Sequence, residues 1–157
     1  MAKRTKSRSD AQQKAEQEML RSFAARKRLA WCEAGGIAAL RGLGVKPDGV
    51  ALRRNGTIVL AEVWAHQGRA KGSQLHKVAA DILKLAYVKR ALEQAGCTVE
   101  AFMLFSCRLA CNTLNNSSWR ARAAAEFGVS PRVVEILPET RKALVEAQEH
   151  QNFYVPE

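Results

Sequence analysis

A hairpin signal between two acidic residues constrains the fold more than any other feature of the sequence. Asn55-Gly56 is typical of a tight turn between antiparallel strands. An extended run, 50–54, precedes it and begins just after Asp48, while residues 57–65 are rich in apolar and β-branched side chains. The pattern predicts two paired strands, with Asp48 at the entrance of the first and Glu62 inside the second.

Strand geometry brings the two acids together. Side chains alternate between the faces of a strand, so Glu62, Trp64 and His66 share one face. Asp48 enters the neighbouring strand and is expected to meet Glu62 across the pair. Two carboxylates so placed can hold Mg²⁺ or Mn²⁺, and such a cation can activate water against a phosphodiester.

The rest of the chain alternates helices and strands. The patterns predict an α/β fold in which helices flank a mixed central sheet of about four strands. The expected helices cover residue 10 to about residue 33, 74 to about 94, 117 or 118 to near 128, and 138 to about 150. The expected further strands are 98–105 and 133–137.

Charge indicates a polyanionic partner. Lys and Arg number 25 against 15 Asp and Glu, which gives a formal net charge of +10 and favours a nucleic acid, DNA or RNA. Residues 1–9 are expected to form a mobile basic arm, and 10–157 a single domain. The expected nucleic-acid contacts are Arg26, Lys27, Arg28, Arg69, Lys71 and Lys84.

Other classes find little support in the sequence. No apolar run approaches the length of a membrane span, and no secretory signal follows the basic start, so a cytoplasmic location is expected. The four cysteines lack the spacing of a zinc site and are expected to be reduced.

Pro47-Asp48, then Glu62, then a helix opening with Gln74, resembles the PD-(D/E)XK nuclease superfamily. The resemblance implies a restriction-endonuclease-like core, Asp48 and Glu62 as ligands of Mg²⁺ or Mn²⁺, endonuclease activity on DNA and a possible homodimer. It also implies a lysine two residues after Glu62, where this chain has Trp64. An acidic residue of the first helix often joins such a site, and Glu16, Glu18 and Glu33 are candidates.

Three interpretations of Trp64 remain open. In the first, the lysine has moved to the following helix, where Gln74, Lys77, Asp81 and Lys84 share one face. Lys77 would then supply the ammonium, and Gln74 would hold a water or a phosphate. In the second, His66 acts as the base. In the third, the fold binds nucleic acid without cutting it.

Structural explanations stand beside these functional ones. Asp48 could simply form a turn with Pro47 and Gly49. Glu62 could belong to a plain ion pair, because an unpaired carboxylate is costly to bury. The leading hypothesis is a small metal-dependent DNA endonuclease acting in repair, junction processing or defence. The alternative is an inactive nuclease-fold protein that binds nucleic acid or serves in assembly.

Overall fold

The computed structural model describes residues 2–152 of the chain. The helices are α1 (Ala2–Lys27), α2 (Ser73–Gln94), α3 (Arg108–Cys111), α4 (Trp119–Glu126) and α5 (Pro138–Asn152), with short 3-10 turns η1 (Ala34–Gly36) and η2 (Ala38–Leu40). The strands are β1 (Gly49–Leu52), β2 (Ile58–Trp64), β3 (Val99–Phe105) and β4 (Val129–Val133).

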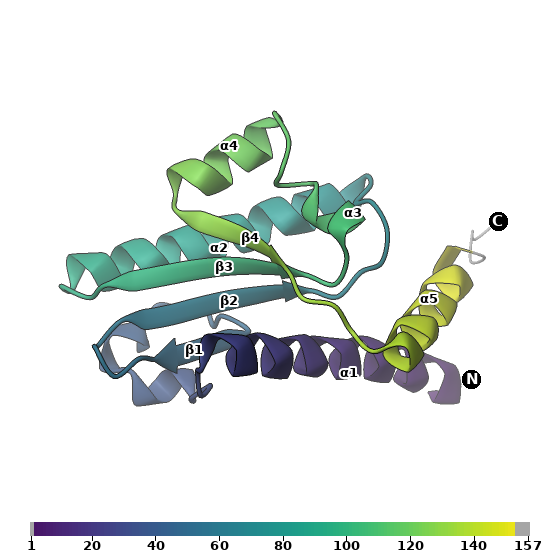
Figure 1. Ribbon diagram of the computed structural model, residues 1–157, viewed down its shortest axis with the longest axis horizontal. Coiled ribbons are helices and arrows are strands. Elements are labelled where there is room, and N and C mark those ends of the chain that lie inside the picture. The colour runs from purple at the N-terminus through teal and green to yellow at the C-terminus, as the bar shows by residue number, and fades with distance from the viewer. Residues whose placement is uncertain (1, 153–157) are drawn as a thin grey trace.

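The strands form one mixed sheet in the order β1-β2-β3-β4 (Figure 1). β1 runs antiparallel to β2, whereas β2, β3 and β4 run parallel to one another. Helix α2 makes the crossover between β2 and β3. The predicted α/β class and four-stranded mixed sheet are confirmed.

Helices cover both faces of the sheet. One face packs against α2, α3 and α4 through Leu60, Met103 and Phe105. The other packs against α1 and α5 through Val59 and Val63. Alternation along β2 therefore directs Glu62, which lies between Leu60 and Trp64, to the α2 side. In Figure 1 the start of α1 and the end of α5 lie at the same end of the molecule.

The turn between β1 and β2 is longer than the two-residue loop that Asn55-Gly56 suggests. The Gly56 amide donates to the Arg53 carbonyl, and Gly56 itself has a φ of 85°. This is a turn followed by a left-handed residue, a conformation that glycine adopts at little cost. The predicted antiparallel pairing is confirmed, with Leu52 opposite Ile58.

Helix α1 differs from its predicted bounds at both ends. It begins at Ala2 and so includes residues 2–9, which the sequence pattern assigned to a mobile arm. It ends at Lys27 rather than near Glu33, because Arg28 takes a φ of 53° and breaks the helix. Trp31 then bridges to Ala51 and donates its indole N–H to the Leu20 carbonyl.

The last strand lies four residues earlier in the chain than the sequence pattern predicts. The apolar run 133–137 suggested it, but the ladder uses Val129–Val133, where Pro131 lies opposite Met103. β4 is an edge strand and therefore tolerates a proline without an amide proton. Val134 and Ile136 instead fill the core beside α1 and α5. The short helix α3 is absent from the helices that the sequence pattern predicts, because four residues are too few to show a helical period.

No helix within residues 2–152 combines the length and the apolar character that a bilayer crossing requires.

Candidate metal and catalytic site

Hydrogen bonds from backbone amides to carboxylates connect Asp48 with the strand that contains Glu62. Gly49 pairs with Ala61, so Asp48 stands opposite Glu62 at the edge of the sheet. The Val63 amide donates to Asp48 Oδ2 at 2.9 Å, and the Asp48 amide donates to Glu62 Oε1 at 3.1 Å. Each carboxylate thus accepts a hydrogen bond from the other's strand, and the two groups lie next to each other.

Glu62 is buried, with 1% of its surface exposed. Its second oxygen, Oε2, lies 2.7 Å from Nζ of Lys84, which reaches it from α2. Lys84 itself retains access to solvent, since 25% of its side chain is exposed. The pair therefore places an ammonium group beside the buried acid, close to the surface.

Burial raises the pKa of Glu62 to about 8. The hydrogen bond from Lys84 lowers this pKa, while the negative charge of Asp48 raises it. Burial also lowers the pKa of Lys84, but its bond to Glu62 and the surrounding carboxylates reverse that effect and leave the pKa raised. Burial dominates at Glu62 and the neighbouring carboxylates dominate at Lys84, so the pKa of each group lies above its ordinary value.

Lys77, expected from sequence to supply the ammonium, pairs within its own helix. Its ammonium lies 3.1 Å from Asp81 Oδ2, one helical turn further along α2, and its side chain is 56% exposed. Lys84, assigned from sequence to a nucleic-acid-binding surface, makes the contact with Glu62 instead. The sequence predicts both lysines on one helical face. The packing of α2 on the sheet determines which of them reaches Glu62.

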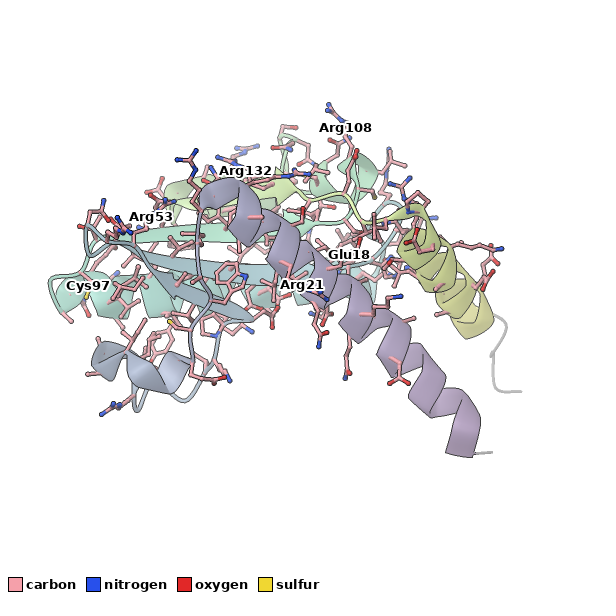
Figure 2. All side chains as sticks on the ribbon, turned by 60° about the horizontal axis from the view of Figure 1, so that its bottom comes forward. Glu18, Arg21, Arg53, Cys97, Arg108 and Arg132 are labelled. Atoms are coloured by element: carbon pink, nitrogen blue, oxygen red, sulfur yellow. The ribbon has the colours of Figure 1, made fainter. Side chains whose placement is uncertain are left out.

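The structure distinguishes the three acids considered near α1. Glu16 lies close enough to Asp48, Lys77 and Asp81 for their charges to affect its pKa, which burial raises. Glu18 accepts from the Leu137 amide and from Thr140 Oγ1 at the start of α5. Figure 2 shows Glu18 on the side of α1 that faces α5. Glu33 is 92% exposed and lies 3.7 Å from Lys46. Of the three, Glu16 alone lies near the other acids, Asp48 and Asp81, which with Glu62 form the acid cluster.

Trp64, His66 and Gln74 form a packed polar-aromatic unit beyond the acids. Trp64 is buried and stacks on His66, with ring centroids 5.0 Å apart. His66 Nε2 lies 2.7 Å from Gln74 Nε2, and its Nδ1 lies 3.0 Å from the Gln67 carbonyl. Burial lowers the pKa of His66.

These contacts occupy both ends of the Gln74 amide, since its Oε1 also accepts from the Lys71 amide. In this arrangement Gln74 orients His66 and closes the loop before α2. For the role expected from sequence, in which Gln74 holds a water or a phosphate, the amide retains its second N–H and the second lone pair of Oε1.

The remaining predicted nucleic-acid residues lie on the surface. Arg69 and Lys71 are exposed in the loop between β2 and α2, and Arg26, Lys27 and Arg28 are exposed at the end of α1. The Lys27 ammonium lies 5.8 Å from the centroid of the Phe102 ring. Within residues 2–152, none of these five cations forms an ion pair with a carboxylate.

Asp48 opens the site to solvent. It is exposed and lies on a surface hollow of about 310 Å³ that Trp31, Lys46 and Gly49 also line. Gly49 is required there by close packing, because a Cβ would approach Leu20 Cδ2 and Trp31 Cζ3 to 3.0 Å. A phosphate could therefore approach Asp48 from outside while Glu62 stays buried behind it.

The donor set suits a small hard cation. The described residues contain no group of three or more His, Cys, Asp or Glu side chains arranged to hold a metal. Mg²⁺, however, commonly binds through one or two carboxylates and completes its shell with waters and substrate phosphates. Asp48 and Glu62 supply two carboxylates and fit that pattern.

Comparison of the chain with protein-family models, with characterised proteins and with solved structures gives no match.

Proposed function

We propose that this protein is a metal-dependent DNA endonuclease with a restriction-endonuclease-like core. One observation carries the proposal: Asp48 and Glu62 lie side by side across the β1–β2 pair, and the Lys84 ammonium lies 2.7 Å from Glu62. Two carboxylates and a lysine are the groups that the sequence resemblance implies. Lys84 supplies from α2 the cation that Trp64 cannot supply from β2.

The chemistry follows from the positions of these groups. Asp48 and Glu62 would hold Mg²⁺ or Mn²⁺, which when bound supplies charge stabilisation to a phosphodiester and acidity to a bound water. Lys84 would leave Glu62 as the carboxylate takes up its metal, and would orient the attacking water or neutralise the phosphate. Glu16 would add negative charge on the α1 side.

The electrostatics support a functional site. A buried carboxyl group whose pKa is raised to about 8, next to a partly exposed lysine, is expensive to retain for folding alone. The positive charge of the chain favours approach of a polyanion. DNA is therefore the expected substrate, with RNA as the other polyanion of the same backbone chemistry.

A catalytically inactive nucleic-acid-binding protein is the second candidate. Both oxygens of Glu62 already have partners, the Asp48 amide and the Lys84 ammonium. If Lys84 stays in place, it substitutes permanently for the metal, and Glu62 serves only as its counter-ion.

Cleavage of supercoiled plasmid DNA in Mg²⁺ or Mn²⁺ tests the proposal. Wild type is expected to nick or linearise the plasmid, and Asp48→Asn and Glu62→Gln are expected to lose at least about a hundredfold in rate. Glu100→Gln is the matched control, because Glu100 is also a strand carboxylate in an ion pair, with Arg53 at 3.0 Å. It should cut like wild type.

Failure takes two forms. Absence of cleavage on plasmid, branched and single-stranded DNA, with salt-sensitive binding intact, would establish the inactive binder. Equal cleavage by wild type and Glu62→Gln would remove this site from the reaction.

A further inference from the structure

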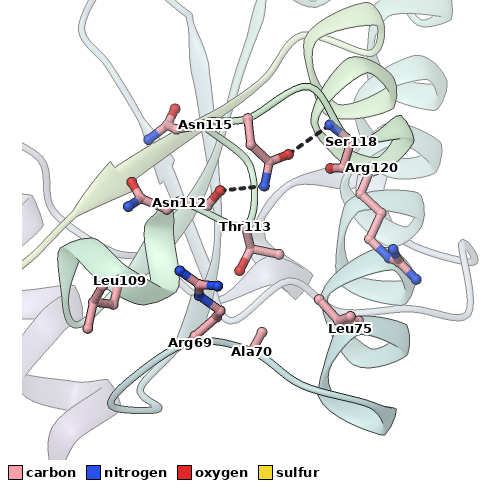
Figure 3. A pocket seen from close by; sticks show the side chains of 10 residues that line it. Arg69, Ala70, Leu75, Leu109, Asn112, Thr113, Asn115, Ser118 and Arg120 are labelled. Carbon is pink, nitrogen blue, oxygen red and sulfur yellow. Dashed lines mark hydrogen bonds between the residues drawn. The ribbon is translucent and has the colours of Figure 1, made fainter.

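A second cavity lies at the carboxyl ends of β2 and β3, beyond the acid site. It has a volume of about 500 Å³ and is formed by the loop before α2, the start of α2, and the α3–α4 segment. Figure 3 shows Arg69 rising from the loop toward Asn112 and Thr113, and Arg120 descending from α4 beside Leu75. Two arginines thus enter the cavity from different elements.

The cavity is built for an anion. No acidic residue lines it, and neither arginine forms an ion pair within residues 2–152. The Nε atom of Arg120 is buried without a hydrogen-bond partner in that same part of the chain. A buried guanidinium N–H without an acceptor is unfavourable, and a shift of the side chain that exposes it would let an anionic oxygen accept from it.

The rim of the cavity is fixed in advance. The Asn116 amide donates to the Asn112 carbonyl at 2.7 Å and accepts from the Ser118 amide at 2.8 Å (Figure 3). The Ser118 hydroxyl in turn accepts from the Ala121 amide and caps α4. These bonds hold the α3–α4 segment in one shape, which lowers the entropy that a ligand must remove on binding.

An aromatic platform stands beside the arginines. Trp119 is 63% exposed, and the Arg120 guanidinium lies 4.7 Å from the centroid of its ring. The guanidinium sits over the ring, while much of the indole remains open to solvent. An exposed Trp next to cations that can contact phosphates is the combination by which proteins bind unpaired nucleotides.

We infer that this cavity, together with Trp119, binds a single-stranded segment of nucleic acid, with one phosphate at Arg69, another at Arg120 and a base stacked on the indole. A base offers its face only when it is unpaired, so duplex DNA would not use the platform. The inference rests on the proposed function for its choice of a nucleic-acid ligand, but it requires no cleavage.

Binding of a labelled oligothymidylate of about twelve nucleotides, measured by fluorescence anisotropy, tests the cavity. EDTA in the buffer keeps metal from the Asp48–Glu62 site. Trp119→Ala is expected to lose about tenfold in affinity, while Trp119→Phe retains most of it. Tyr87→Ala is the matched control, since Tyr87 is a 50% exposed aromatic on α2 outside the cavity lining. It should bind like wild type.

The arginines are tested by salt. Arg69→Ala/Arg120→Ala should bind more weakly and reduce the slope of log affinity against log salt by about 1.4. Arg54→Ala/Arg90→Ala removes the same charge outside the cavity lining, with Arg54 in the turn at the opposite end of β2. This control should weaken binding less. For a duplex of equal length, Trp119→Ala should bind like wild type.

Equal binding of the oligonucleotide by wild type, Trp119→Ala and the Arg69/Arg120 variant would overturn the inference. So would absence of binding by wild type at low salt, or an equal loss of duplex and single-strand affinity in Trp119→Ala. Binding that depends on Trp119, in a protein that cuts nothing, would keep this site and reject the nuclease. Cleavage with Trp119-independent binding would do the reverse.

Discussion

Lys84 and Lys77 lie on the same helical face, yet their surroundings differ in kind. Lys84 is largely covered and bonded to a buried acid, whereas Lys77 is more than half exposed and bonded to its own helix. An exposed pair within one helix contributes little to stability or binding. We therefore assign the proposed role in the reaction to Lys84 alone.

Lys84→Met is expected to lower the rate of plasmid cleavage by at least about a hundredfold. Because Lys84 lowers the pKa of Glu62, its removal should also move the pH–rate profile toward higher pH. Lys77→Met is the matched control, and its rate should change by less than about fivefold. If Lys77→Met were the inactive variant and Lys84→Met cut normally, the assignment would be reversed.

Glu62 also predicts a dependence of stability on pH. Its pKa is about 8 in the folded protein and near 4.5 when exposed. Its contribution to stability is therefore complete below about pH 4.5 and is lost as the pH rises to about 8. Urea unfolding across this window, in EDTA, should show a flatter pH dependence for Glu62→Gln than for wild type. His66 and Glu16 titrate in both proteins, and their effects cancel in the comparison. Parallel curves of unfolding free energy against pH would contradict the raised pKa of Glu62.

At the scale of elements, one α1 side chain fixes the start of α5. The Glu18 carboxylate accepts from the Leu137 amide and the Thr140 hydroxyl, and Thr140 is buried. A carboxylate at a helix start satisfies a free amide and interacts favourably with the helix dipole. Glu18 thus anchors the C-terminal helix to the first one rather than serving the acid cluster.

Glu18→Ala is expected to cost about 1–2 kcal/mol of unfolding free energy, measured by chemical denaturation. Amide hydrogen exchange in α5 should accelerate more than exchange in α2. Gln17→Ala, at the exposed neighbouring position, is the control and should change neither. Unchanged exchange in α5 for Glu18→Ala would show that the cap contributes nothing to the helix.

Elements with local signals could be predicted from the sequence. The pairing of β1 with β2, helix α2, strand β3, a cap at Ser117 or Ser118 and the start of α5 at Pro138 all follow from turn residues, capping residues and periodicity. The end of α1 and the place of β4 could not. Trp31 fills its core position from outside the helix, and Val134 does so from outside the sheet. An apolar pattern indicates which residues are buried, but it does not indicate whether a helix, a strand or a loop places them in the core.

In the candidate site, too, some contacts could be predicted from the sequence and others could not. Alternation along β2 and the hairpin turn predict that Asp48 and Glu62 meet. The choice of Lys84 over Lys77 is not encoded locally, since seven residues of helix span about 10 Å. Which lysine reaches Glu62 depends on where α2 rests along the sheet. The selection of Glu16 over Glu18 depends likewise on how α1 lies between the sheet and α5.

On the scale of the whole molecule, the acid site and the arginine-lined cavity follow one another along the chain. Glu62 lies near the end of β2, and Arg69 lies in the loop that leaves it. The charge of +10 supplies the long-range attraction, and the two sites supply the local contacts. A strand held by the cavity would remain close to the acids that are proposed to act on it.

The stoichiometry of Mn²⁺ binding, measured by electron paramagnetic resonance on the full chain without nucleic acid, shows whether Asp48 and Glu62 share one cation. We expect one Mn²⁺ site per chain that is lost in Asp48→Asn and in Glu62→Gln and is retained in Glu100→Gln. Retention of the same site in both acid variants, or no Mn²⁺ binding by wild type above pH 8, where Glu62 has released its proton, would contradict it.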